Sequence, residues 1–424
     1  MNSRVWMRTI VNMLVVCTVA LNMVLADGFR NPPEGGSALG RAGMRLTQGD
    51  DPAVITHNPA NMMDLPKASV MSAFTFAYSK TDYTNPFGIS EESEDPWSIL
   101  PAVYAVMPLR EGECRLGVGL HVPYGQAKKW DSDGVFRIGA PYYAMMKSIN
   151  LNPSLATRIG ESLAVGVGVN LMWSELEFKQ GLPWLPPPAG LMGPVSRLRF
   201  DGDGYGFGAN IGLTWQVSDA QRVAVSYRSP VSVEYDGDFS MANPPPPGAL
   251  PPMITPTSDF ETEIDFPSIL GIGYGVRLSD SVRAEMNVEW IEHSRNEELD
   301  LDIENNNTLL VMSAGTTSIP QQWDDTWTVG LGADWQVNSE WTLRTGWTYL
   351  PTPVPEETMM PSLAEGDRNV LALGAGYRKD RHAADIAYAY NISEDRTVDA
   401  PQNMIQGDYE FEPHLISVSY AYTF

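Results

Sequence analysis

The stretch Leu163-Ala164-Val165-Gly166-Val167-Gly168-Val169-Asn170-Leu171-Met172-Trp173-Ser174 decides the fold. Large apolar residues alternate with small or polar ones, so one face of an extended strand is apolar and the other is not. The same alternation returns at 205–216, 282–290, 327–337, 341–349 and 416–424. Trp and Tyr stand at the strand ends, where transmembrane barrels carry rings of aromatic side chains. The pattern therefore favours an all-β transmembrane barrel over a soluble sandwich, which also alternates.

The links between these segments fall into two length classes. Short polar turns such as 159–161 and 218–220 alternate with long links such as 179–203 and 237–257. Short periplasmic turns and long extracellular loops are typical of outer-membrane barrels. We therefore expect about fourteen antiparallel strands between residues 68 and 424, with both ends of the barrel chain in the periplasm.

Residues 1–26 have the features of a cleaved signal peptide. Arg4 and Arg8 precede an apolar stretch, and Val24-Leu25-Ala26 supplies a cleavage site, so we expect export to the outer membrane. Beyond residue 26 no uncharged apolar run reaches the length of a membrane-spanning helix. Cleavage removes Cys17 and leaves Cys114, so the mature chain is expected to form no internal disulfide.

Charge and motifs argue against several classes of function. The net charge of −24 argues against nucleic acid as a partner, because phosphate binding needs clustered Lys and Arg. The chain has 5 histidines, which are scattered, and it contains neither a Gly-x-Ser-x-Gly elbow nor a His-Glu-x-x-His motif. We expect no catalytic residues, no metal and no cofactor; an outer-membrane hydrolase remains the enzymatic alternative.

Residues 27–67 do not read as a strand. Four glycines between 35 and 43 break regular pairing, and Asn58-Pro59 forces a turn. A barrel of about fourteen strands has a wide lumen, and this segment carries apolar residues that it could bury there. We expect an N-terminal hatch at 27–67 inside a barrel formed by 68–424. The alternative is a disordered tail.

The ordered set of short motifs resembles the FadL family of outer-membrane transporters for long-chain fatty acids and, in some branches, aromatic hydrocarbons. The resemblance rests on Gly28-Phe29, Ala38 to Gly43, Asp50 to Ala53, Asn58 to Ala60, Tyr227 to Ser229, Trp327 to Gly332, Trp341 to Arg344, Pro353 to Pro355 and Asp367-Arg368. It implies a fourteen-stranded barrel closed by a hatch, whose motif residues here are Gly40, Arg41, Asn58, Pro59 and Ala60. It also implies lateral release of ligand through an inward kink of the third strand.

Two sets of residues are candidates for ligand capture and release. Gly117, Gly119 and Pro123 in the third strand are candidates for the kink, since proline removes a ladder hydrogen bond and glycine permits a bulge. A plain strand end at Pro123 is the alternative. Two loops are unusually apolar and, in the family, the matching loops form an outer groove; a simple loop cap is the alternative. The capture residues are Leu182, Trp184, Leu185, Leu191, Met192, Leu250, Met253 and Ile254.

The charge of the ligand stays open at this point. A carboxylate ligand needs Arg or Lys, and Arg228, Arg344 and Arg368 are candidate inward cations. Relatives that take fatty acids tend to carry a basic residue before the tenth strand, where this chain has Asp324 and Asp325. We predict uptake of hydrophobic compounds, with fatty acids first and neutral hydrocarbons as the alternative. A general diffusion porin is the other alternative.

The remaining expected partners belong to the membrane. An outer-membrane barrel contacts lipid and lipopolysaccharide, and the terminal Phe424 resembles the aromatic residue that barrel-insertion machinery reads. We expect a monomer.

Overall fold

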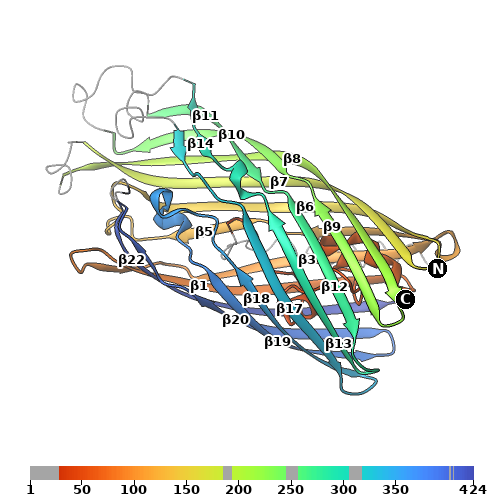
Figure 1. Ribbon diagram of the computed structural model, residues 1–424. Helices are drawn as coiled ribbons and strands as arrows, with labels where there is room; N and C mark the ends of the chain where they lie inside the picture. The colour runs from red at the N-terminus through yellow and green to blue at the C-terminus, as the bar shows by residue number, and fades with distance from the viewer. Residues whose placement is uncertain (1–27, 185–192, 245–255, 305–317, 401–402, 404) are drawn as a thin grey trace.

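The protein is described by a computed structural model that covers residues 28–184, 193–244, 256–304, 318–400, 403 and 405–424. Long antiparallel strands dominate it (Figure 1). No helix in this part of the chain is long and apolar enough to cross a bilayer. The expected signal peptide lies outside the described residues. So do the capture residues Leu185, Leu191, Met192, Leu250, Met253 and Ile254.

The strands close into a barrel with 14 strand positions, as predicted. The ring is closed by pairing of the first position with the last, from Ser69 opposite Thr423 to Thr84 opposite Asp408. In order the positions are β1 (Ser69–Thr84), β3 (Trp97–Leu109), β4 with β5 (Cys114–His121, Gly125–Lys129), β6 (Pro141–Ile159), β7 (Leu163–Pro183), β8 (Val195–Ser218), β9 with β10 (Gln221–Arg228, Val231–Ala242), β11 with β12 (Thr257–Phe266, Ile269–Arg277), β13 with β14 and β15 (Val282–Ile291, Glu298–Asp300, Asp302–Ile303), β17 (Thr326–Gln336), β18 (Trp341–Leu350), β19 (Arg368–Lys379), β20 (His382–Ser393) and β22 (Gly407–Thr423).

Three short strands lie near the long links: β2 (Ser90–Glu92), β16 (Ser318–Pro320) and β21 (Arg396–Val398). We call this end of the barrel the long-loop end and the opposite one the short-turn end. Several strands extend further toward the long-loop end than the sequence predicted. β8 begins at Val195, although we expected it near residue 204, and Leu182 lies in β7 and not in a loop.

The outward face changes its chemistry along β8, and this explains the missed strand length. Toward the short-turn end Phe207 and Ile211 point outward and are 73% and 43% exposed. Toward the long-loop end the outward residues are Asp201 and Asp203, while Phe200 points inward and is 1% exposed. The alternation continues, but its polarity inverts near Tyr205. The lower part of the barrel, toward the short-turn end, is thus suited to lipid on its outer face. The upper part, toward the long-loop end, is suited to water on its outer face and encloses an apolar interior.

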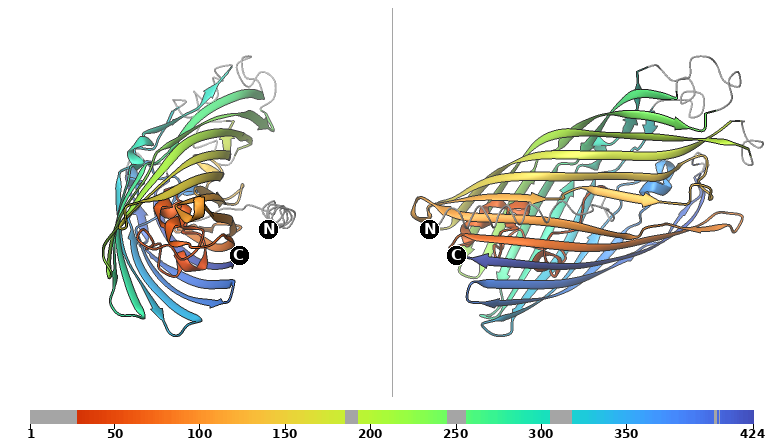
Figure 2. Two further views of the ribbon diagram at one scale, coloured as in Figure 1. Left: turned by 90° about the vertical axis from the view of Figure 1, so that its right-hand side faces the viewer. Right: turned by 180° about the vertical axis from the view of Figure 1, so that it is seen from behind.

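Residues 28–67, here the N-terminal segment, lie inside the ring of strands near the short-turn end (Figure 2). The segment contains α2 (Gly36–Leu39), α3 (Val54–His57) and the 3-10 helix η1 (Pro59–Asp64). The helix α2 contacts β19, β20 and β22, and η1 contacts β6, β7 and β8. Its apolar side chains are buried, among them Leu39, Leu46, Val54, Ile55 and Met62.

Candidate functional site

Asn58 anchors the N-terminal segment to the barrel wall. Its Nδ2 donates to the carbonyl oxygen of Leu46 at 2.8 Å and to Thr214 Oγ1 at 2.9 Å, and its Oδ1 accepts from the amide of Ala60 at 3.1 Å. The facing wall residue is Gly212, where an added Cβ would lie 1.9 Å from Asn58 Oδ1. The side chains of Asn58 and Pro59 therefore approach β8 closely at Gly212, and the backbone of Pro59 and Ala60 approaches β7 closely at Gly166.

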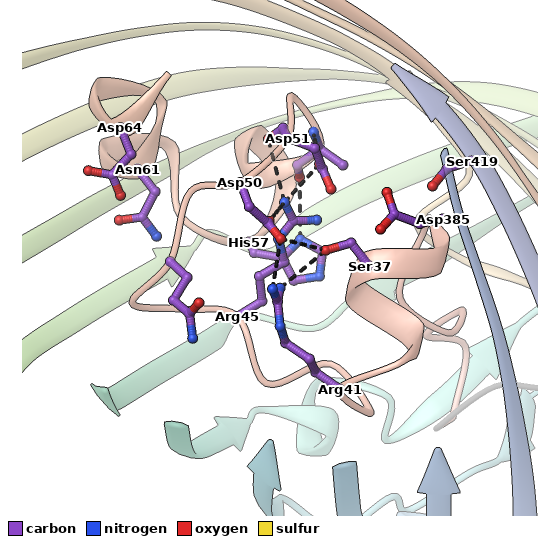
Figure 3. Close-up of polar contacts among 12 residues, drawn as sticks. Ser37, Arg41, Arg45, Asp50, Asp51, His57, Asn61, Asp64, Asp385 and Ser419 are labelled. Carbon is purple, nitrogen blue, oxygen red and sulfur yellow. Dashed lines mark hydrogen bonds and ion pairs between the residues drawn. The ribbon is translucent and has the colours of Figure 1, made fainter. Parts of the chain in front are cut away.

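A second anchor is a buried network of arginines and aspartates around Arg41 (Figure 3). Arg41 Nη2 lies 2.7 Å from Asp50 Oδ2 within the N-terminal segment, and Arg41 Nε lies 2.7 Å from Asp334 Oδ1 on β17. Arg45 contacts Asp50 and Asp51, both at 2.7 Å. Burial alone would raise the pKa of Asp50, but Arg41 and Arg45 outweigh burial and hold that pKa well below its usual value.

Arg344 belongs to this network and does not line a ligand cavity. Its Nη1 lies 2.7 Å from Asp385 Oδ1, and its Nε lies 3.3 Å from Asp334 Oδ1. Gly40 lies beside it, because an added Cβ at Gly40 would meet Gly374 Cα at 3.1 Å and Arg344 Cβ at 3.3 Å. Sequence reasoning placed Arg344 on the inner face, which is where it lies, but its charge is matched by aspartates of the wall.

An inner cavity of about 130 Å³ lies between the N-terminal segment and the wall. Arg30 Nη1 lies 2.6 Å from Glu289 Oε2 at its edge. Arg228 Nη2 donates to the carbonyl oxygen of Thr56 at 2.7 Å, and no carboxylate of the described residues lies within 4.0 Å of its guanidinium group. The structure thus brings Arg228 and Arg368 to one cavity, whose lining includes Arg30, Glu34, His57, Pro123, Arg228 and Arg368.

An outer pocket of about 70 Å³ lies nearer the long-loop end. Its lining is almost wholly apolar and includes Phe29, Met145, Leu176, Phe178, Ile264 and Leu363. Phe29 forms the floor: its ring centroid lies 4.6 Å from that of Trp323 and 6.0 Å from that of Phe266. Because Arg30 lines the inner cavity, the chain passes from one compartment to the other between two consecutive residues.

The third strand position is interrupted between His121 and Gly125. Pairing with β6 runs to His121 opposite Asn150 and resumes at Gly125 opposite Lys147, so the third strand holds one extra residue, as in a bulge. Pro123 lies in this interruption. Gly117 and Gly119 do not: both lie in regular pairing, and their missing side chains leave room for Met62 and Tyr104. Of the three kink candidates, only Pro123 therefore lies in the interruption.

At the interruption β3 and the third strand are not paired with each other, and we call this stretch of wall the lateral seam. β3 pairs with β4 up to Val103 opposite Leu120, and the next described pairing is the bridge of Glu94 with Lys129. The seam therefore lies between residues 95–102 and 121–128. The side chains of Leu100 and Val122 pack together there and are both buried.

The N-terminal segment pairs with the free edge at the seam. The amide of Asn31 donates to the carbonyl oxygen of Pro123 at 3.0 Å, and the amide of Gly125 donates to that of Phe29 at 2.9 Å. Further along, His121 Nδ1 lies 2.9 Å from Glu34 Oε1. Burial would raise the pKa of Glu34, but His121 outweighs burial and lowers it to about 2. Sequence reasoning missed Phe29 and Glu34 as site residues, because nothing local in the chain signals their distant partners.

Two capture residues fall in the described part of the chain. Leu182 is 6% exposed and packs in the apolar interior of the upper barrel. Trp184 Nε1 donates to Ser196 Oγ at 3.0 Å, which ties the end of β7 to β8. No group of three or more His, Cys, Asp or Glu in the described ranges is arranged to hold a metal ion.

A closed antiparallel barrel with an apolar outer belt, an apolar upper interior and a chain segment inside the ring defines an outer-membrane transport protein. Residues 17–424 match the family model described as outer membrane protein transport protein (OMPP1/FadL/TodX). The chain belongs to this family, whose members are transport proteins of the outer membrane and not enzymes.

Individual relatives are distant. The long-chain fatty acid transport protein of Salmonella typhi is 22% identical, over 97% of each chain. The structure of a Pseudomonas aeruginosa FadL homologue superposes with a TM-score of 0.81 at 21% identity, over 94% of this chain and 100% of that one. The toluene transporter TodX of P. putida gives 0.72 at 16% identity, over 92% and 98%. Structural likeness at these identities establishes the fold alone.

Proposed function

We propose that this transporter takes up amphiphilic or apolar compounds, long-chain fatty acids first, by capture at the long-loop end and release through the lateral seam. One observation carries the proposal: an apolar outer pocket and a cation-bearing inner cavity meet at Phe29 and Arg30, beside an unpaired stretch of wall. A water-filled pore would offer an apolar molecule no favourable path, whereas an apolar pocket does.

The route would have three stages. The apolar extracellular loops collect ligand, and the outer pocket receives it as water leaves both apolar surfaces. The ligand then passes Phe29 into the inner cavity, and finally leaves between Leu100 and Val122 into the lipid of the outer membrane. Since the packed side chains of Leu100 and Val122 occupy the seam, release requires these two residues to separate.

The N-terminal segment would act as the plug of the barrel. Its buried network with Asp334, Arg344 and Asp385 and its anchor at Asn58 hold it across the lumen. A general diffusion porin would need an open lumen, so this arrangement favours a carrier with a lateral exit. We also propose that the barrel works as a monomer in contact with lipid and lipopolysaccharide, and that Phe424 serves its insertion.

A neutral hydrocarbon is the second candidate, because the outer pocket is apolar and Asp324 and Asp325 stand where fatty-acid carriers tend to have a cation. The relatives cover both cases: that of Salmonella typhi is a long-chain fatty acid transport protein, and TodX is a toluene transporter. Arg228, which lacks a carboxylate partner among the described residues, favours an anionic ligand.

Mass spectrometry of compounds that co-purify with the barrel, combined with uptake of labelled oleate and toluene by cells that express it, tests the proposal. We expect a bound long-chain acid and faster oleate uptake than in cells without the protein. If neither oleate nor toluene enters faster than in cells without the protein, the proposal is refuted. A large steady current across planar bilayers would favour the porin. Incubation with phospholipid and peptide substrates tests for hydrolysis.

A further inference from the structure

A third, smaller cavity lies beside the third strand, where residues 126–128 of the lateral seam line it. Its volume is about 30 Å³, and we call it the side pocket. It shares Gln126 with the outer pocket and Arg368 with the inner cavity, so it lies where the two compartments approach each other. Its polar lining consists of Ser79, Gln126, Lys128, Glu365, Arg368 and Ser393.

Lys128 reaches this pocket from β5 and is 7% exposed. Its Nζ donates to Thr81 Oγ1 at 2.5 Å, and no carboxylate of the described chain lies within 4.0 Å of it. An ammonium group has three donors, so two remain after the bond to Thr81. A buried charge that contacts only a hydroxyl group is costly, and an anion in the pocket would relieve that cost.

Two further polar atoms point to an absent group in the same place. Gln126 is 9% exposed, and its Oε1 is buried without a hydrogen-bond partner among the described residues. Ser393 Oγ on β20 is likewise buried without a hydrogen-bond partner among the described residues. Buried polar atoms are almost always satisfied. The hydroxyl of Ser393 can donate to an anion, whereas Gln126 Oε1 can only accept, for example from a water beside that anion.

The other charges at the pocket do not cancel that of Lys128. Glu365 accepts from the amide of Gly28 at 3.3 Å and from Thr352 Oγ1 at 2.8 Å, and its Oε2 lies 3.6 Å from Arg368 Nη2. Lys128, Arg368 and Glu365 are the charged residues of the lining, which thus carries one more positive than negative charge. A water needs roughly 10–15 Å³ on this measure, so the pocket holds about two waters, or the two oxygens of one carboxylate.

We infer that the side pocket is a head-group site, in which Lys128 binds the carboxylate of a ligand whose alkyl chain lies in the outer pocket. The inference rests on the proposed function and narrows it, because a neutral hydrocarbon has no group to place beside Lys128. Ser393 donates a further hydrogen bond to the carboxylate, while Arg368 carries positive charge on the side toward the inner cavity. Lys128 is thus the residue that selects acids over neutral compounds of the same length.

The test compares oleate with methyl oleate, which differ only at the head group. Binding of each radiolabelled compound is measured by equilibrium dialysis with the purified full-length barrel in non-ionic detergent. We expect the wild type to prefer oleate, and Lys128→Met to bind oleate about ten- to hundredfold more weakly while its affinity for the ester is unchanged. The matched control is Lys80→Met, which removes an outward-facing lysine of β1 that pairs with Asp82 and Glu92.

A second variant guards against a folding defect in Lys128→Met. Ser393→Asp places a carboxylate in the side pocket and should abolish the preference for oleate while leaving ester binding intact. Equal loss of both compounds in either folded variant, or wild-type oleate affinity in Lys128→Met, overturns the head-group site but not the proposed function. If the wild type binds neither compound, the proposed function itself fails.

Discussion

The amide of Gly125 donates a hydrogen bond of 2.9 Å to the carbonyl oxygen of Phe29. This bond joins the N-terminal segment to the third strand at the point where that strand loses its pairing with β3. The residue that floors the outer pocket is therefore held by the same strand that borders the lateral seam. A movement of Phe29 would therefore displace Gly125, and a movement of Gly125 would displace Phe29.

Replacing Phe29 with alanine should join the outer pocket to the inner cavity. Phe29 is 5% exposed and packs on Trp323, so the change removes the partition at a local cost of about 3–5 kcal/mol. We expect bound oleate to dissociate several-fold faster, as followed with a fluorescent analogue by stopped flow. Phe207→Ala, at an outward residue that is 73% exposed, is the control. Unchanged dissociation in Phe29→Ala would contradict the partition.

Cross-linking the lateral seam should stop release. The double variant Leu100→Cys and Val122→Cys places two thiols where the buried side chains now touch. On oxidation we expect uptake of labelled oleate to fall to the level of cells without the protein, and a reducing agent to restore it. Either single variant is the control for substitution alone. Full uptake by the cross-linked barrel, with the cross-link verified by mass spectrometry, would exclude exit at this seam.

Removing Arg41 should loosen the N-terminal segment. Arg41→Met leaves Asp334 and Asp50 with fewer buried partners, and breaking such a pair costs about 3–5 kcal/mol. We expect faster hydrogen exchange across residues 36–51 and a larger planar-bilayer current. Arg295→Met is the matched control, because Arg295 pairs with Glu292 at the surface, where an ion pair contributes about 1 kcal/mol or less. Wild-type exchange and current in Arg41→Met would argue against the anchor.

Acid should loosen the segment only at low pH. The pKa of Glu34 is lowered to about 2, so its pairing with His121 contributes stability above the ordinary carboxyl pKa of about 4.5. That contribution is lost as the pH falls from there through about 2. Hydrogen exchange at residues 30–36 should be protected equally between pH 7 and 5 and should lose protection below pH 4. In His121→Asn we expect the loss to begin at higher pH, and an unchanged profile would contradict the role of His121.

The sequence predicted the fold correctly where a whole strand alternates between apolar residues that face lipid and small or polar residues that face the lumen. Alternation such as that at Leu163 to Ser174 identified the lipid-facing wall, and the two length classes of the links gave the number of strands. The prediction assumed apolar residues outward, so it missed the upper part of β8, where Phe200 points inward and Asp201 outward. The alternation was visible there, but the sequence did not tell which of the two faces points outward. That depends on where the membrane ends along the strand.

The candidate site was less predictable for a different reason. Pro123 stood out because proline breaks a ladder, whereas Gly117 and Gly119 stood out for a bulge and instead make room for Met62 and Tyr104. A glycine signals close approach without naming what approaches. The pairing of Arg41 with Asp334, and of Glu34 with His121, joins residues far apart in the chain, and no local pattern specifies such partners.

The inverted outer face of the upper barrel also sets how deep the protein sits. Carboxylates crowd there on neighbouring strands, with Asp236 opposite both Asp203 and Glu261, and Asp238 opposite both Asp201 and Asp259. Each of these carboxylates would lose its hydration if the barrel moved deeper into the bilayer, so the ring of carboxylates limits how deep the barrel can sit. The apolar belt below resists being lifted into water. Between the two, the depth of the barrel in the bilayer is fixed, so that on the proposed route the long-loop end stays in water, where ligand is captured.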